Sequence, residues 1–143
     1  MPLRWVLLEP HVAPTTLVRA ALPLLEPDCY YIILCLDGGQ DSVKSGEPRG
    51  GCEKRLDLYK QHKAYQAETA DPNSPNYIKK ITAGPMVNDD DTMMRGSCFV
   101  VQVKSRDEAE KFYKNDPFFL NNVWDSVICN RYTLVPGCAV PSL

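Results

Sequence analysis

The sequence predicts a single α+β domain in which four antiparallel strands form one sheet and two helices cover one of its faces. Segments rich in β-branched and aromatic residues alternate with segments of helical spacing, in the order β-α-β-β-α-β. The chain has 143 residues, which is enough for one domain. Its composition, 44% hydrophobic and 24% charged, is typical of a globular protein.

The first strand, the first helix and the second strand occupy the first half of the domain. CYYIILCLD, residues 29–37, is a continuous apolar run that ends in Asp-Gly-Gly, as buried strands often do. After a polar, glycine-rich loop, residues 53–69 carry a helical pattern. DPNSPN ends that helix because prolines do not fit inside a regular element. YIKKITAGP is then a short strand that stops at Gly84-Pro85.

The second half contains two further strands and a second helix. VNDDDTMMRG is predicted to be an acidic loop and SCFVVQVK the third strand. Ser105 and Glu108 form a capping box for a helix over RDEAEKFYKN. Asp116-Pro117 ends this helix, FFLNNVW is a short helical turn, and SVICNRYTLV is the fourth strand.

This order of elements is ferredoxin-like, and it places both crossover helices on one face of the antiparallel sheet. The other face would then expose several hundred Å² of apolar surface, which stable monomers rarely tolerate. Two copies packed face to face would bury that surface with two-fold symmetry. The strand pattern therefore predicts a homodimer.

The ends of the chain are expected to lie outside this domain, which is predicted to span residues 29–135. Residues 1–28 contain several prolines and lack the order of a signal peptide, so they are interpreted as an extension, and His11 receives no functional role. A mitochondrial presequence is the alternative interpretation. Residues 136–143 are an irregular tail. We expect a cytoplasmic protein.

Several functional classes are disfavoured by composition and motifs. A net charge of −2 gives no basic surface for nucleic acid, and no apolar run reaches the roughly 20 residues of a membrane span. The six cysteines form no CxxC pair, and most lie in apolar runs, which indicates reduced thiols. No phosphate-binding loop is present, and no third ligand accompanies His62 and the aspartates, so neither a metal nor a cofactor is expected.

His62 is the main candidate for chemistry, within the helical stretch KRLDLYKQHKAYQAE. Arg55 and His62 lie about 20° apart on a helix, on the same side as Leu58 and Tyr65. A hydrogen-bonded core histidine is one interpretation of this position. The neighbouring arginine favours another, because a buried guanidinium needs a carboxylate or an anionic ligand. Two such groups on an inward face indicate a cavity that receives negative charge.

The acidic loop supplies candidate partners for His62. A carboxylate from Asp89, Asp90 or Asp91 could fix the tautomer of the imidazole and leave its other nitrogen free to move a proton. Simple solvation of three exposed aspartates is the alternative. Ser97, predicted at the start of the third strand, could orient a ligand or have a structural role.

Four segments of the chain resemble the YCII-related family of small dimeric α/β-barrel proteins. They are YYIILCLD, RLDLYKQHKAY, ITAGPMVNDDD and GSCFVVQVKSRDEAEKFYKNDPF, and together they run from about residue 29 to residue 135. Two stretches, GEPRGGCE and DPNSPN, look like additions to the compact form of the family, and they could reshape the rim of a pocket.

The resemblance implies a site and an activity. It places a catalytic pair on His62 and Asp90, with Asp89 as the alternative, and it matches Arg55 to the arginine of the family. Arg55, Asp89 and Ser97 are the residues expected to bind the substrate. Relatives of the family act on small ring compounds, including by dehydrochlorination. The implied function is a cofactor-independent lyase or isomerase for a small anionic or aromatic metabolite. The alternative is a non-catalytic dimer that binds a small molecule or regulates a partner.

Overall fold

The computed structural model describes residues 28–39, 43–46, 49–133 and 135, so the N-terminal extension up to residue 27, His11 and the tail from residue 136 lie outside the described residues. The main elements, in chain order, are β1 (Cys29–Asp37), α2 (Glu53–Glu68), β4 (Lys79–Val87), β5 (Met94–Val103), α3 (Arg106–Lys114), α4 (Pro117–Leu120) and β6 (Trp124–Tyr132). The predicted loop after β1 also contains two-residue strands that sequence analysis missed, β2 (Val43–Lys44) and β3 (Gly51–Cys52).

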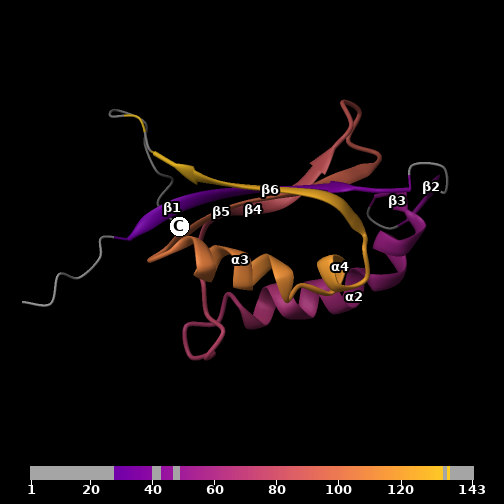
Figure 1. The fold of residues 1–143 in the computed structure, drawn as a ribbon. Coiled ribbons are helices and arrows are strands. Elements are labelled where there is room, and N and C mark those ends of the chain that lie inside the picture. Colours follow the sequence, from indigo (N-terminus) through magenta and orange to yellow (C-terminus); the bar gives the residue numbers. More distant parts are fainter. Residues whose placement is uncertain (1–27, 40–42, 47–48, 134, 136–143) are drawn as a thin grey trace, which may run out of the picture.

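The four long strands form one antiparallel sheet in the order β4-β5-β1-β6. The predicted α+β, ferredoxin-like fold is therefore confirmed. Figure 1 shows α2, α3 and α4 together on one side of this sheet. Side chains that alternate along β1 and β5 face the helices, and Ile33, Cys35 and Val101 among them are fully buried. They pack with Phe112 of α3 and Phe118 of α4 in the hydrophobic core.

The opposite face of the sheet carries apolar side chains that remain exposed. Leu36 on β1 and Ile128 and Tyr132 on β6 are 46%, 44% and 41% exposed. No helix of the described residues lies on this face (Figure 1). The sheet thus has the bare apolar face on which the expectation of a dimer rests.

The structure corrects the expected position of Ser97. The hairpin between β4 and β5 continues further than predicted, because Met86 pairs with Gly96 and Val87 pairs with Met94. Ser97 consequently lies inside β5, opposite Pro85, and it is buried instead of standing at a strand start. The acidic loop is reduced to a tight turn between the two strands.

Side-chain caps define the ends of the two C-terminal helices. Ser105 Oγ accepts a hydrogen bond from the backbone N–H of Glu108 at 3.3 Å, which confirms the predicted cap of α3. Asp116 caps α4 in the same way, since its Oδ1 accepts from the N–H of Phe118 at 2.8 Å and Pro117 occupies the first turn. The sequence is thus organised locally to hold the Asp116 carboxylate in place.

Two further observations bear on chemistry. The cysteines within the described residues, Cys29, Cys35, Cys52, Cys98 and Cys129, are all free thiols. No helix in the described part of the chain combines the length and the apolar character needed to cross a membrane.

Gly96 is expected to be intolerant of any side chain. A Cβ at this position would overlap the carbonyl oxygen of Cys35 on the neighbouring strand. Gly96→Ala should lower the free energy of unfolding by about 2–3 kcal/mol, measured by urea denaturation, because the backbone cannot easily move. Gly84→Ala is the matched control, since a Cβ there meets nothing within 4 Å. Equal stability of the two variants would contradict the packing described here.

Candidate functional site

His62 and Asp116 form a buried pair at the centre of the site. Nδ1 of His62, on α2, lies 2.8 Å from each carboxylate oxygen of Asp116. The Asp116 side chain is fully buried and that of His62 is 9% exposed. Because the carboxylate accepts, Nδ1 carries the proton, and Nε2 has no hydrogen-bond partner among the described residues. This is the arrangement in which an imidazole can exchange a proton at Nε2.

The carboxylate that contacts His62 is not the one that was predicted. The pairing with Asp90 is wrong, because Asp90 lies in the exposed β4–β5 turn and accepts hydrogen bonds from the backbone and hydroxyl of Thr92. Asp89 is also exposed in that turn. Asp91 binds Arg49 with both oxygens, at 2.7 and 2.9 Å, which lowers the pKa of its carboxyl group. The acidic turn serves loop structure and does not meet the imidazole.

Asp116 is held by more than the imidazole. Gln66 Nε2, one turn after His62 on α2, donates to Oδ2 of Asp116 at 2.8 Å. The N–H of Phe118 donates to Oδ1. Three donors therefore fix the carboxylate, as a buried charge requires. These hydrogen bonds prevent the Asp116 carboxylate from rotating away from the imidazole.

Arg55 is buried as predicted, but its charge is already neutralised within the protein. Its Nε and Nη2 bind the two oxygens of Asp37, at the end of β1, at 2.6 and 3.0 Å. Nη2 also donates to Ser97 Oγ at 2.9 Å. Arg55 is 1% exposed. The expectation that this guanidinium holds the charge of a substrate gains no support, because a carboxylate of the protein occupies it.

Phe118 connects the His62–Asp116 hydrogen bond with the Arg55–Asp37 ion pair. Its ring stacks on the His62 ring with centroids 3.9 Å apart and planes inclined by 7°. The Arg55 guanidinium lies 4.6 Å from the centre of the same ring. Trp124 meets the imidazole edge-on at 6.1 Å. These contacts leave the imidazole ring little freedom to rotate.

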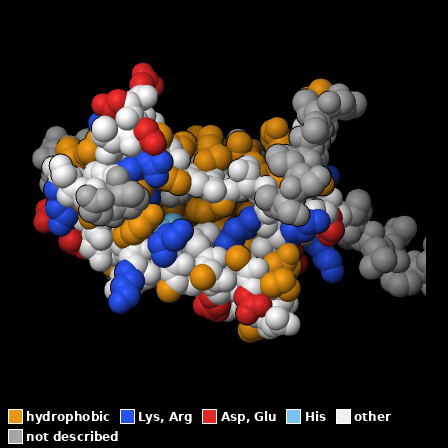
Figure 2. Space-filling view, turned by 180° about the vertical axis from the view of Figure 1, so that it is seen from behind, with side chains coloured by type: hydrophobic (Ala, Val, Ile, Leu, Met, Phe, Trp, Pro, Cys, Tyr) orange, Lys and Arg blue, Asp and Glu red, His pale blue; other side chains and the backbone are white. Residues whose placement is uncertain are grey.

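A cavity of about 260 Å³ lies next to His62, between α2 and the strands β4 and β5. Its lining includes Arg55, His62, Gln66, Lys80, Ser97 and Phe99, together with the Gly84-Pro85 segment. No carboxylate is among the lining residues within the described part of the chain. Figure 2 shows this side of the molecule, where Lys and Arg side chains surround the small pale-blue histidine surface and the acidic side chains in view lie mainly toward the edges.

Lys80, on β4, contributes a partly buried amine to this cavity. Its Nζ donates to the backbone oxygen of Gln66 at 2.9 Å and to Thr69 Oγ1 at 2.8 Å. Burial lowers the pKa of Lys80 to about 8; the Asp116 charge opposes this shift and Lys63 adds to it. Sequence analysis did not single out Lys80, since nothing in YIKKITAGP distinguishes one lysine from the next.

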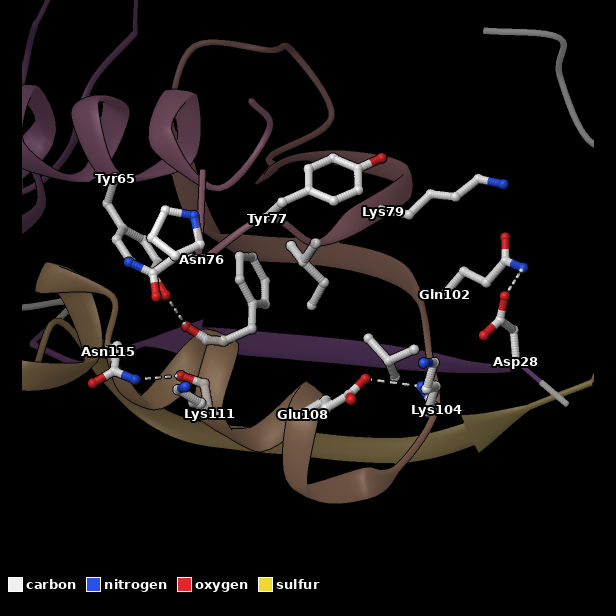
Figure 3. Close-up of a pocket in the computed structure, with 14 residues that line it drawn as sticks. Asp28, Tyr65, Asn76, Tyr77, Lys79, Gln102, Lys104, Glu108, Lys111 and Asn115 are labelled. Carbon is white, nitrogen blue, oxygen red and sulfur yellow. Dashed lines mark hydrogen bonds between the residues drawn. The ribbon is translucent and has the colours of Figure 1, made fainter. Parts of the chain in front are cut away.

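A larger hollow of about 690 Å³ lies where the end of α2 meets α3 and the ends of β4 and β5 (Figure 3). Its polar groups are largely engaged with one another: Tyr65 donates to the carbonyl of Phe112 at 2.7 Å, and Gln102 donates to Asp28 at 3.1 Å. It contains no histidine among its described lining residues. The smaller cavity, which His62 lines, is therefore the stronger candidate for an active site.

Metal binding has no evident donor set in the part of the chain that the structure describes. No group of three His, Cys, Asp or Glu side chains there is arranged to hold an ion. His62 Nδ1 is occupied by Asp116, so Nε2 is the ring nitrogen that remains for a ligand.

The functional residue that sequence reasoning missed is Asp116. It was interpreted only as the end of a helix, although an aspartate directly before proline is a frequent helix N-cap. That local signal fixes the carboxylate but does not reveal its partner, which lies 54 residues earlier in the chain.

Asp116 is expected to contribute far more to stability than Asp90. Asp116→Ala should lower the free energy of unfolding by about 3–5 kcal/mol, because it removes the acceptor of three hydrogen bonds from a buried site and leaves their donors unpaired. Asp90→Ala should cost about 1 kcal/mol or less, since that side chain is exposed. Urea denaturation at neutral pH compares them, and a larger loss for Asp90→Ala would contradict the assignment of the pair.

Comparison with known proteins agrees with this description of the fold. The family model described as the YCII-related domain matches residues 30–132. No curated protein matches the chain. A solved structure does match: 5-chloro-2-hydroxyhydroquinone dehydrochlorinase (TftG) from Burkholderia phenoliruptrix AC1100, in complex with 2,5-dihydroxybenzoquinone. It is 25% identical, with a TM-score of 0.53, and the match covers 73% of this chain and 93% of that chain.

The family match spans most of the chain and includes every residue of the site: His62, Asp116, Arg55, Asp37 and Lys80. The similar solved structure shares this fold over 73% of the chain, with a TM-score of 0.53. The chain belongs to the YCII-related domain family.

Proposed function

We propose that this protein is a cofactor-independent enzyme that uses His62 for acid–base chemistry on a small ring compound, as a lyase, an isomerase or a dehydrochlorinase. The observation that carries the proposal is the imidazole whose Nδ1–H is bound by the buried Asp116 while the ring lines a cavity. A histidine held in one tautomer by a carboxylate is a common general base.

The proposed chemistry starts with proton transfer to Nε2. A ring hydroxyl, or a C–H next to a carbonyl, gives its proton to Nε2, and the imidazolium that forms is stabilised by the Asp116 carboxylate. The electron pair left on the substrate either expels a leaving group such as chloride or accepts the proton again at another atom. The first outcome is a lyase reaction, with net loss of HCl when the leaving group is chloride, and the second is an isomerisation.

The size and lining of the cavity favour a single-ring substrate. Drug-sized ligands occupy pockets of about 300–1,000 Å³, and this cavity, at about 260 Å³, lies just below that range. Phe99 supplies an aromatic wall, and the charged groups that face the cavity are cationic. The similar dehydrochlorinase is described with a hydroxylated chloro-aromatic substrate and a dihydroxyquinone ligand. Such compounds are small, planar and readily ionised.

A non-catalytic binding or regulatory dimer is the alternative. It would be favoured if both ring nitrogens of His62 were bonded to backbone atoms and no cavity adjoined the ring. Neither condition holds, since Nδ1 is bound to a carboxylate and the ring lines the cavity. The catalytic proposal therefore ranks first.

The catalytic proposal is tested through His62. With 5-chloro-2-hydroxyhydroquinone as the first substrate assayed, chloride release by the wild-type protein should fall by about 10²–10⁴-fold in His62→Asn, since the general base is removed. Asp90→Asn, a change of a carboxylate outside the cavity, should leave the rate unchanged. Chloride release that survives in His62→Asn would refute the role of the imidazole. A wild-type protein that binds single-ring phenols without turnover would favour the binding alternative.

We also propose that two copies of the chain pair through the bare face of the sheet. The exposed Leu36, Ile128 and Tyr132 on that face support this arrangement, because two-fold pairing would bury them. Each domain would keep its own His62, because the cavity lies on the helical side of the sheet.

Light scattering on a sizing column tests the dimer. The wild-type chain should have twice the mass of one copy, and Ile128→Asp should shift it to one copy because a charge would enter the apolar interface. Leu120→Asp is the matched control, since Leu120 is 63% exposed on α4, on the other side of the sheet. A monomeric wild-type protein, or an Ile128→Asp variant that remains dimeric, would contradict the arrangement.

A further inference from the structure

An anionic substrate needs an unneutralised cation in the cavity, and Arg55 does not provide one. Its guanidinium is bound by both oxygens of Asp37 and by Ser97. Breaking that buried ion pair to bind a substrate would leave Asp37 without its charge partner. His62 is likewise committed to Asp116 through Nδ1. The negative charge of a ligand must therefore be met by another residue.

An irregularity in β4 turns Lys80 toward the helices. Lys80 pairs with Val101 of β5, whereas Thr82 pairs with Val100, so Ile81 is an extra residue in the strand. Such a bulge changes which side chain faces each side of the sheet. Val101 is fully buried beneath the helices, and its partner Lys80 points to the same side. If the register of Thr82 with Val100 continued without the bulge, Ile81 would pair with Val101 and take the place of Lys80.

The amine of Lys80 is held by neutral groups only, and the centre of the Phe112 ring lies 5.3 Å from its Nζ. Its two acceptors are the carbonyl of Gln66 and the hydroxyl of Thr69. Among the described residues, none of the ion pairs includes Lys80. An ammonium group has three protons, so one N–H remains for a ligand in the cavity that Lys80 lines.

We propose that Lys80 binds the negative charge of the ligand, a carboxylate or an ionised phenol on a single ring, and so determines the specificity of the site. The inference rests on the proposed function for the identity of the cavity, and it adds the class of ligand and the residue that selects it. Lys80 and His62 both line the cavity of about 260 Å³, so a single anionic ring held at Lys80 would lie within the same small space as the imidazole.

The charge of Lys80 gives the binding a pH dependence. The titratable groups around it are Lys63 and His62 of α2 and Asp116 at the start of α4. Because the pKa of Lys80 is lowered to about 8, its positive charge is present below that pH and is lost above it. Affinity for an anion should therefore fall as the pH rises through about 8, and a neutral ligand should show no such loss.

Binding of benzoate and of its uncharged counterpart benzamide, measured by calorimetry, tests the proposal. Wild-type protein should prefer benzoate, and Lys80→Met should lose about 10- to 100-fold in benzoate affinity with little change for benzamide. Lys80→Arg should retain benzoate binding and keep it between about pH 7 and about pH 9.5, where the wild type loses it. Lys79→Met is the matched control, because this neighbouring lysine is exposed and does not line the cavity.

Two results would overturn the assignment of Lys80: no preference of the folded wild-type protein for benzoate, or the same preference in a folded Lys80→Met variant. Denaturation curves of each variant establish folding, and Lys80→Arg provides a second variant that retains the charge. The outcome is separable from the catalytic proposal, because the preference for benzoate over benzamide is measured as affinity, without turnover. Turnover that depends on His62 without a Lys80-dependent preference would refute this inference alone.

Discussion

The contact between His62 and Asp116 is the interaction on which the site depends. It joins the middle of α2 to the turn between α3 and α4, and both side chains are almost completely buried. Leaving either group unpaired there would cost several kcal/mol, so the contact constrains how the helices pack as well as how the imidazole is oriented. Gln66 and the N–H of Phe118 occupy further lone pairs of the same carboxylate.

An ion pair between Arg55 and Asp37 lies at the other end of this arrangement. Phe118 lies between the two pairs, stacked on the imidazole and beneath the guanidinium. Each buried charge thus has an internal partner and an aromatic neighbour. The consequence is a cavity whose strong polar groups are fixed before any ligand arrives, which is the kind of preorganisation that acid–base catalysis needs. Lys80 differs from these groups because its charge has no internal carboxylate partner among the described residues.

The elements that could be predicted from the sequence are those with a local signal. The run CYYIILCLD, the spacing of Arg55 and His62, and the pair Ser105 and Glu108 specify a strand, an inward helix face and a helix cap without reference to the rest of the chain. The position of His62 on the buried face of α2 was confirmed for that reason. Asp90 was a wrong partner: it binds Thr92 within its own turn, and the neighbouring Asp91 binds Arg49.

The remaining features of the site arise from long-range pairing. Asp116 reaches His62 across 54 residues of sequence, and Asp37 reaches Arg55 across 18. Lys80 faces the cavity because β4 contains one residue more than β5 at that point, which residue types alone do not reveal. Likewise, β5 begins before Ser97 because the hairpin with β4 extends through Met94. The start of β5 is therefore determined by its pairing with β4 and not by the residue types of the strand.

The central claim is that His62 presents a free Nε2 to the cavity because Asp116 holds the proton on Nδ1. Nitrogen-15 NMR of the imidazole side chain measures this directly in the free protein. At neutral pH the His62 ring should carry a slowly exchanging proton on Nδ1, and that signal should lose its protection in Asp116→Ala. A ring protonated only at Nε2, or one whose signals are the same in both proteins, would contradict the account.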